Sequence, residues 1–160
     1  MMPASAWIGI GANLGDARAA VRSAIERLAD LADSSLTARS SLYSTAPIDS
    51  TGDDYINAVV RITTALAPEA LLRELQKIEL DHGRERPYRN APRTLDLDLL
   101  LYGEAIIATP DLTVPHPRLH QRAFVLVPLL ELDAGLAIPG LGPAAAYLPG
   151  VAEQAIAKTQ

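Results

Sequence analysis

Leucine and aspartate alternate in the stretch Thr-Leu-Asp-Leu-Asp-Leu-Leu-Leu at residues 94–101, and this pattern constrains the fold more than any other part of the chain. Alternate side chains of a β-strand point to the same face. The leucines expected to bury together on one face are Leu95, Leu97, Leu99 and Leu101. Asp96 and Asp98 then share the opposite face, with side chains about 6–7 Å apart.

The aspartate pair predicts a metal site. Carboxylates this close repel each other unless a cation lies between them. Mg²⁺ prefers oxygen ligands and usually takes one or two carboxylates, which leaves positions for substrate phosphates. The alternative is a solvent-exposed stripe on an amphipathic strand, although aspartate is disfavoured within strands. We favour Asp96 and Asp98 as metal ligands and keep the solvated stripe as the alternative.

The net charge of the chain limits the kinds of partner that it can bind. The chain has 14 Lys and Arg against 19 Asp and Glu, a formal net charge of −5. Sequence-independent binding to nucleic acid or anionic lipid needs a broad basic surface, so both kinds of partner are disfavoured.

The chain has no cysteine, which excludes disulfides and cysteine-ligated metals and fits a reducing, cytoplasmic location. The N-terminus lacks the basic and apolar regions of a signal peptide.

Residues 83–93 place several arginines on this acidic chain just before the aspartate pair: Arg84, Arg86, Arg89 and Arg93. Planar guanidinium groups beside a magnesium site suit a polyphosphate, whose remaining charge they would neutralise. The alternative is a solvated loop whose arginines pair with nearby acids.

A second basic group follows Pro115 and consists of His116, Arg118, His120 and Arg122. It is either a further phosphate-binding group or a structural one. A zinc site at His116 and His120 is open on spacing alone, but no third ligand is evident.

Glycines in residues 9–16 follow one expected strand and precede a helix, which raises the question of a dinucleotide-binding turn. The spacing G-x-G-x-x-x-G is one residue longer than that fingerprint. A Walker A loop is excluded, because neither Lys77 nor Lys158 follows a glycine.

Hydrophobic periodicity and turn residues predict the order strand, helix, strand, strand, helix, strand. The expected strands are 6–10, 36–43, 55–64 and 94–102, and the expected helices are 16–31 and 68–83, with a further helix at 120–130. This order suggests an α+β chain with a ferredoxin-like βαββαβ core, its helices on one face of a mainly antiparallel sheet. We expect one domain over residues 1–160, with residues 134–152 as an irregular coat over the core.

Several motifs now resemble one family. Gly-Ala-Asn-Leu-Gly-Asp at 11–16, Tyr-Ile-Asn-Ala at 55–58, Pro-Arg-Thr-Leu-Asp-Leu-Asp at 92–98 and Leu-Thr-Val-Pro-His-Pro at 112–117 occur in the order seen in 6-hydroxymethyl-7,8-dihydropterin pyrophosphokinases. The resemblance implies a ferredoxin-like αβα sandwich. It also implies transfer of diphosphate from ATP to the pterin hydroxymethyl group in folate biosynthesis, with release of AMP.

The resemblance implies a role for individual residues. Asp96 and Asp98 would hold two Mg²⁺ ions. The residues implied in catalysis are Arg84, Arg93, Asp96, Asp98, His116 and Arg122. Those implied in ATP binding are Gln76, Arg84, Arg86, Arg93, Leu99, Thr113, His116 and Arg122. Those implied in pterin binding are Thr45, Tyr55, Asn57, Asp96 and Phe124.

This sequence departs from the family pattern at three positions: Ala12 in place of serine, no loop tryptophan near Asn90, and Pro117 in place of tyrosine. We expect a monomer that acts on ATP and a reduced pterin. Two other classes stay open: an oxidoreductase that binds NAD(P) through the glycine turn, and a non-catalytic module that binds a partner through its sheet.

Overall fold

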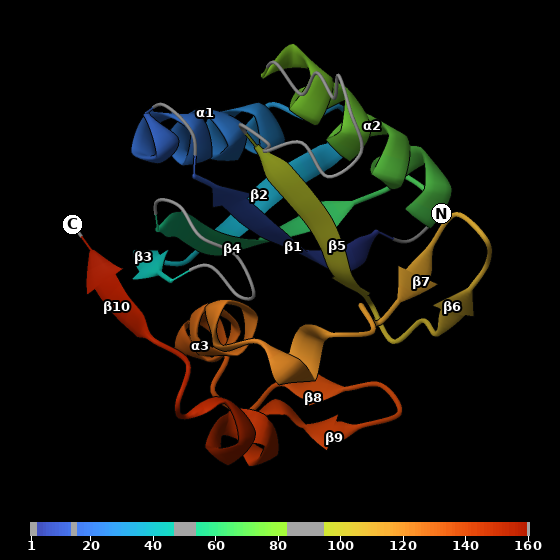
Figure 1. Ribbon diagram of the computed structural model, residues 1–160. Coiled ribbons are helices and arrows are strands. Elements are labelled where there is room, and N and C mark those ends of the chain that lie inside the picture. Colours follow the sequence, from blue (N-terminus) through green and yellow to red (C-terminus); the bar gives the residue numbers. More distant parts are fainter. Residues whose placement is uncertain (1–2, 14–15, 47–53, 83–94, 160) are drawn as a thin grey trace.

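A six-stranded antiparallel sheet forms the centre of the protein, seen here in a computed structural model that describes residues 3–13, 16–46, 54–82 and 95–159 (Figure 1). Its strands are β1 (Ala4–Ala12), β2 (Ser34–Arg39), β3 (Leu42–Thr45), β4 (Tyr55–Thr64), β5 (Asp96–Tyr102) and β10 (Ile156–Thr159). The order is β10-β3-β4-β1-β5, with β2 also paired to β4. This is the antiparallel split-βαβ arrangement that the sequence predicts.

The single strand predicted at 36–43 is wrong, because the chain breaks into β2 and β3 around Ser40 and Ser41. The Ser40 N–H donates to the Val59 carbonyl at 2.9 Å, and the Ser40 hydroxyl accepts the Val59 N–H at 2.9 Å. The Ser41 N–H instead donates to the Glu131 carboxylate at 3.0 Å. The Glu131 side chain thus takes the place of a strand carbonyl as the partner of the Ser41 N–H. On either side of this break, β2 and β3 pair with successive parts of β4.

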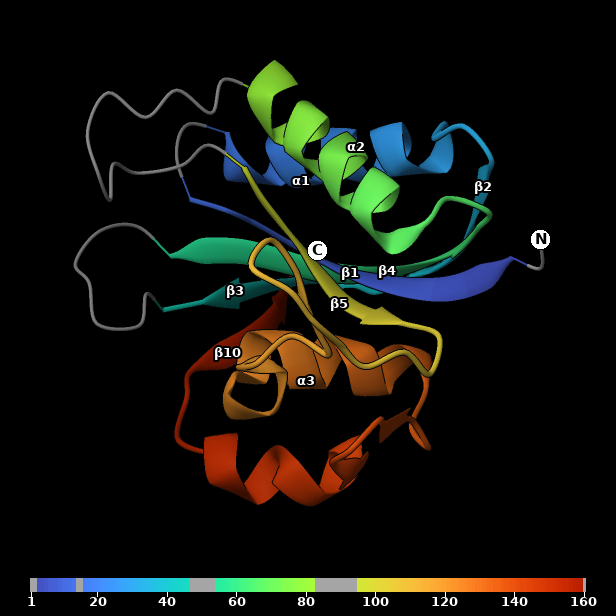
Figure 2. The same cartoon turned by 90° about the vertical axis from the view of Figure 1, so that its right-hand side faces the viewer.

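Two helices cover one face of the sheet, α1 (Ala17–Ala29) and α2 (Pro68–Asp81) (Figure 2). The side chain of Asp16 caps α1 by accepting the Ala19 N–H at 3.0 Å, and α2 begins with proline at its first turn, where a missing N–H costs nothing. Both predicted helices are confirmed within two residues. Leucine and isoleucine side chains from both helices pack on Ile8, Ile10 and Ile62 in the first core.

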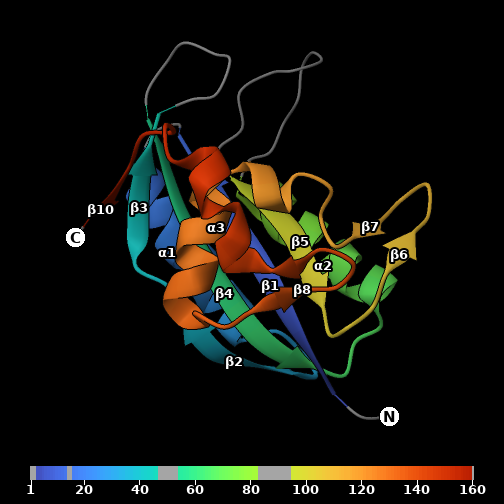
Figure 3. The ribbon, with the colours of Figure 1, turned by 90° about the horizontal axis from the view of Figure 1, so that it is seen from below.

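The opposite face is also covered, by α3 (Ala123–Leu132) and the 3₁₀ helices η1 (Leu119–Gln121) and η2 (Ala144–Val151) (Figure 3). These pack on Trp7 and Val59 in a second core. The prediction of helices on one face is therefore wrong, whereas the αβα sandwich implied by the resemblance is confirmed. The helix predicted at 120–130 begins instead at Ala123, because Arg122 is extended (φ −130°, ψ 119°).

A β-bulge changes the face of one predicted core leucine. Trp7 pairs with Leu101 and Ile8 pairs with Leu99, so Leu100 is an extra residue on β5. Leu95, Leu97 and Leu99 bury in the first core as predicted, but Leu101 buries in the second core with Leu100. An extra residue reverses the alternation beyond it.

Residues 134–152 are more regular than the predicted coat, because β8 (Ala137–Ile138) forms a short hairpin with β9 (Gly142–Pro143) and η2 follows it. Before this region, β6 (Ile107–Ala108) forms another short hairpin with β7 (Thr113–Val114). After η2 the chain returns to the sheet, where β10 pairs with β3 and Ile156 lies opposite Thr45. None of the helices in the described ranges is long and apolar enough to cross a membrane.

Candidate active site

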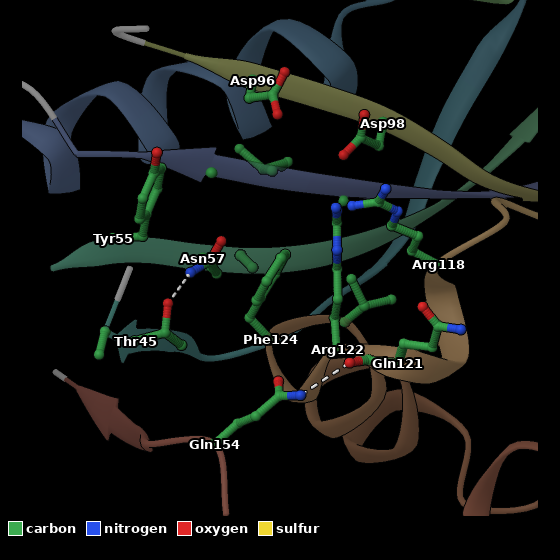
Figure 4. A pocket seen from close by; sticks show the side chains of 16 residues that line it. Thr45, Tyr55, Asn57, Asp96, Asp98, Arg118, Gln121, Arg122, Phe124 and Gln154 are labelled. Carbon is green, nitrogen blue, oxygen red and sulfur yellow. Dashed lines mark hydrogen bonds between the residues drawn. The ribbon is translucent and has the colours of Figure 1, made fainter. Parts of the chain in front are cut away.

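A cavity of about 410 Å³ lies between the sheet and the N-terminal end of α3 (Figure 4). Its polar and aromatic lining consists of Thr45, Tyr55, Asn57, Asp96, Asp98, Arg118, Gln121, Arg122, Phe124 and Gln154. All of the residues that the resemblance implies for the pterin, and both implied metal ligands, therefore line this one cavity. They come from β3, β4, β5 and α3, which are far apart in the sequence.

Two glycines of β1 form the floor. Gly11 pairs with Asn57 on one side and Asp96 on the other, and Gly9 pairs with Asp98. A Cβ atom on Gly11 would lie 2.9 Å from Asn57 Oδ1, and one on Gly9 would lie 3.4 Å from the Leu100 side chain. The missing side chains leave the space between the aspartates and Asn57 open.

These positions make the dinucleotide-binding interpretation wrong. Gly9 and Gly11 lie inside a strand of an antiparallel sheet. The dinucleotide fingerprint needs its glycines in the turn between a strand and a helix of a parallel βαβ unit.

Asp96 and Asp98 both point from β5 into the cavity (Figure 4). The residue between them, Leu97, donates its N–H to Glu79 of α2 at 2.8 Å. Glu79 is only 2% exposed. Because β5 is at the end of the sheet, this bond satisfies an N–H on its outer edge and fixes the strand that carries both aspartates.

The donor set suits magnesium better than zinc. In the parts of the chain that the structure describes, no three His, Cys, Asp or Glu side chains gather closely enough to hold a metal ion. The zinc alternative at His116 and His120 therefore lacks a third ligand there, and the His120 ring instead packs edge-on against Tyr147 at 5.0 Å. Two aspartates alone fit Mg²⁺, which keeps water or phosphate oxygens in its other positions.

A buried polar pair forms one wall. Asn57 donates from Nδ2 to Thr45 Oγ1 at 2.7 Å, and each residue is 4% exposed. The Thr45 hydroxyl proton and the Asn57 Oδ1 atom stay available to hydrogen bond a ligand in the cavity. This wall can recognise the polar edge of a flat heterocycle.

Aromatic and cationic groups complete the lining. Tyr55 and Phe124 both border the cavity, and the Arg122 guanidinium lies over the Phe124 ring, with Cζ 5.4 Å from the ring centre. Arg118 and Arg122 extend from below toward the aspartates of β5 (Figure 4). A ligand that places an aromatic ring near Phe124 and an anion near these arginines would fit this arrangement.

His116 lies beside this cationic group. Its N–H donates to the Leu100 carbonyl at 2.9 Å, and its Nδ1 accepts the Arg118 N–H at 3.2 Å. Burial lowers the pKa of His116, and the positive charges of Arg122 and Arg118 lower it further against the opposing effect of Asp96. Because Nδ1 accepts this bond, the neutral form of the His116 ring carries its proton on Nε2, which can donate to an anion.

Among the predicted ATP-binding residues that the structure describes, only Arg122 lines the cavity, whereas Gln76, Leu99, Thr113 and His116 do not. Gln76 is exposed on α2, Thr113 is exposed on β7, and the Leu99 side chain is buried in the first core. Since the Leu97 N–H points away from β1, the main chain of Leu99, two residues further along, faces the same outer edge. Arg84, Arg86 and Arg93 lie outside the described residues.

Gln121 and Gln154 line the cavity without having been predicted. No sequence signal marked them, because glutamine is common on surfaces and Gln154 lies far along the chain from the motifs. Arg118 belongs to the second basic group but was not assigned to the site. Its position beside His116 was the available signal.

Comparisons with known proteins point to one family over most of the chain. The family model for 7,8-dihydro-6-hydroxymethylpterin-pyrophosphokinase (HPPK) matches residues 7–134. A 2-amino-4-hydroxy-6-hydroxymethyldihydropteridine pyrophosphokinase of Haemophilus influenzae is 43% identical over 136 residues, which are 84% of this chain and 85% of that protein. The Pseudomonas aeruginosa protein of the same name is 41% identical and covers 83% of each chain.

Solved structures show the same fold. A structure described as HPPK-DHPS in complex with substrates superimposes with a TM-score of 0.76 at 12% identity, and a wild-type Plasmodium falciparum HPPK-DHPS with a TM-score of 0.72 at 13% identity. The matches cover 96% and 91% of this chain, but only 44% and 43% of those chains. The present chain thus spans less than half the length of these solved proteins.

Proposed function

Because the chain belongs to the 7,8-dihydro-6-hydroxymethylpterin-pyrophosphokinase family, we propose that it transfers diphosphate from ATP to the hydroxymethyl group of 6-hydroxymethyl-7,8-dihydropterin, releases AMP and serves folate biosynthesis. One observation carries the proposal. The aspartate pair, the Asn57–Thr45 pair and the Arg122–Phe124 pair, which come from separate elements, border the same cavity.

The pterin would bind at the wall made by β3 and β4. Its ring would stack between Tyr55 and Phe124, which supply flat apolar surfaces. Its amide and amino edge would bond to Asn57 and Thr45, whose shared hydrogen bond of 2.7 Å holds both groups in place. Asp96 lines the same cavity and would then lie on the side of the hydroxymethyl group, as the resemblance implies.

ATP would lie along β5 on the side of the arginines. His116 and Arg122 would hold its α-phosphate, with His116 donating from Nε2. Arg84, Arg86 and Arg93 would bind the transferred phosphates, and Gln76, Thr113 and the main chain of Leu99 would hold the nucleoside. Arginine suits these positions because its planar group can bind two phosphate oxygens at once.

Asp96 and Asp98 would hold two Mg²⁺ ions. The glycine floor supports this assignment, since it leaves room beside both carboxylates for phosphate oxygens. When bound, magnesium supplies neutralisation of the charge on the transferred phosphates.

The protein contributes position and charge to the reaction. The pterin oxygen must lie in line with the β-phosphorus and its bond to the leaving oxygen, a geometry that fixed binding sites on β4 and α3 can impose. Arg122 and His116 stay on the AMP side and stabilise the leaving group. No side chain has to become phosphorylated. We propose that a monomer is sufficient, because these groups come from one chain.

The deciding experiment is incubation of the protein with ATP, Mg²⁺ and 6-hydroxymethyl-7,8-dihydropterin, with nucleotide products separated by chromatography. We expect AMP and the pterin diphosphate, and no AMP when 6-methyl-7,8-dihydropterin replaces the substrate, since that pterin lacks the acceptor hydroxyl. Formation of ADP, or of AMP independent of the pterin, would contradict the proposal.

A further inference from the structure

Arg122 sits at an unusual junction in the backbone. It lies between η1 and α3, with extended angles of φ −130° and ψ 119°. It does not cap α3 with its own side chain. The first N–H of the helix, on Ala123, and the last carbonyl of η1, on Gln121, therefore both need partners from elsewhere.

One side chain satisfies both groups. Gln154 Oε1 accepts the Ala123 N–H at 2.9 Å, and Gln154 Nε2 donates to the Gln121 carbonyl at 2.9 Å. The two bonded peptide groups are those immediately before and after Arg122. Figure 4 shows the Gln154 amide below Arg122, with the bond to Gln121 drawn. A single amide thus fixes the backbone from which the Arg122 side chain extends.

We propose that Gln154 is a positioning residue for the reaction, which holds Arg122 and Phe124 in the geometry that binds substrate. This rests on the proposed function, since it assigns Arg122 to ATP and Phe124 to the pterin. The Arg122 guanidinium lies 5.4 Å over the Phe124 ring, so a shift of this turn moves both groups together.

Gln154 is itself held firmly. Its N–H donates to the Val151 carbonyl at 3.0 Å, which ends η2. Two residues later β10 begins, and Ile156 pairs with Thr45 on the opposite wall of the cavity. The C-terminal segment, residues 152–159, therefore connects the Arg122 side of the cavity to the wall that contains Thr45 and Asn57.

This segment lies beyond the part of the chain that the family model matches, which ends at residue 134. The site motifs that carry the resemblance all lie before it. A residue from outside the matched region thus completes the cavity, and the C-terminal segment belongs to the active site rather than only covering the core.

The test is Gln154→Met, which keeps the length of the side chain but removes both hydrogen bonds. We expect kcat/KM for ATP to fall about tenfold, as the loss of two hydrogen bonds to positioned groups implies. The thermal midpoint should change by only a few degrees, so the variant stays folded in the assay. Glu153→Ala, at the exposed neighbouring position, should match the unchanged protein.

A double-mutant cycle separates positioning from general stability. If Gln154 acts through Arg122, Gln154→Met should cost much less in an Arg122→Ala background than alone. Values of kcat/KM within twofold of the unchanged protein for Gln154→Met, or an undiminished loss in the Arg122→Ala background, would overturn the proposal.

Hydrogen exchange tests the contact without any turnover. The Ala123 amide should exchange at least tenfold faster in Gln154→Met than in the unchanged protein, because its acceptor is gone. If the unchanged protein makes no AMP, the proposed function has failed. The exchange rate at Ala123 still tests the hydrogen bond to Gln154, because an unchanged rate in Gln154→Met would show that this bond does not protect the amide.

Discussion

At the scale of residues, the cavity depends on what Gly11 lacks. Gly11 lies in β1 between Asn57 and Asp96, so any side chain there would point into the space between the polar wall and the aspartates. Asn57 is held by Thr45 at 2.7 Å and is almost fully buried, which leaves it little freedom to move aside. The need for glycine is therefore one of space and not of backbone angle.

Gly11→Ala should weaken pterin binding. Its Cβ would lie 2.9 Å from Asn57 Oδ1, and relief of such a contact costs about 1–3 kcal/mol. The expected result is a higher KM for the pterin with less change in KM for ATP, measured by steady-state kinetics. Gly150→Ala is the matched control, because a Cβ there meets no atom within 4 Å. Equal effects of both substitutions on KM would contradict this account.

Asp98→Ala should nearly abolish turnover while the fold persists. The substitution removes one of two proposed magnesium ligands, and kcat should fall roughly 100-fold or more. Circular dichroism and the thermal midpoint should stay close to those of the unchanged protein. Asp111→Ala, at an exposed position outside the cavity, serves as the control. Near-normal AMP formation by Asp98→Ala with Mg²⁺ present would exclude the metal assignment.

At the scale of elements, single carboxylates join helices to strands at places where the backbone ladder is incomplete. Glu79 of α2 takes the outer N–H of Leu97 on β5. Glu131 of α3 takes the N–H and hydroxyl of Ser41 and the Tyr43 hydroxyl, at distances of 2.6 to 3.1 Å. Each contact fixes a helix against the strand beside it.

Glu79→Ala should destabilise the protein and disturb the aspartate pair. The Leu97 N–H would lose its partner in a buried position, at a cost of about 1–3 kcal/mol. Urea unfolding should show the loss. Glu79→Gln keeps an acceptor oxygen and should recover part of the stability and of the activity. A Gln variant no better than the Ala variant would show that acceptor geometry at Leu97 is not the cause.

The free energy of unfolding should decrease at acidic pH, because Glu131 becomes protonated. Burial alone would raise the pKa of Glu131, but hydrogen bonds from Tyr43 and Ser41 and the charge of Lys158 lower it below its ordinary 4.5. A lowered folded pKa means that the carboxylate contributes its full stability above about pH 4.5 and loses it as pH falls through the lower folded value. Urea midpoints measured at successive pH values should decline more steeply in the unchanged protein than in Glu131→Gln. Parallel declines would contradict this assignment.

At the scale of the whole molecule, the sheet is buried on both faces and its two cores are separated by β1, β4 and β5. The cavity opens where these central strands meet α3. A formal net charge of −5 conceals a local concentration of arginine and histidine beside the cavity. Charge is therefore segregated, with cations placed where a polyphosphate would bind.

Ligands that bridge the strands and α3 should stabilise the folded protein. The test uses a non-hydrolysable ATP analogue together with Mg²⁺ and the pterin. With the analogue at about 100 times its dissociation constant, the free energy of unfolding should rise by about 2.7 kcal/mol. In a chain of this size that corresponds to a rise in thermal midpoint of roughly 5–11 °C. Asp98→Ala should show a smaller rise. An unchanged midpoint in the unmodified protein would contradict binding at this cavity.

Local patterns predicted the elements that depend on local physics. The cap at Asp16 and the proline that begins α2 each act within a few residues, and the corresponding boundaries are right or nearly so. The strand predicted at 55–64 likewise has the bounds of β4. The failures have distant causes. Glu131 breaks the predicted strand at Ser41, and pairing with β1 creates the bulge that turns Leu101 to the other core.

The sequence by itself determined the α+β order, the acidic stripe on β5 and, through motif resemblance, the residues to examine. Only the tertiary structure decided that Gly9 and Gly11 are a cavity floor, that α3 covers the second face and that Gln154 fixes the turn around Arg122. The physical reason is the range of the interactions. Periodicity and capping act between neighbours along the chain, whereas a cavity forms from side chains that meet only after the sheet has assembled.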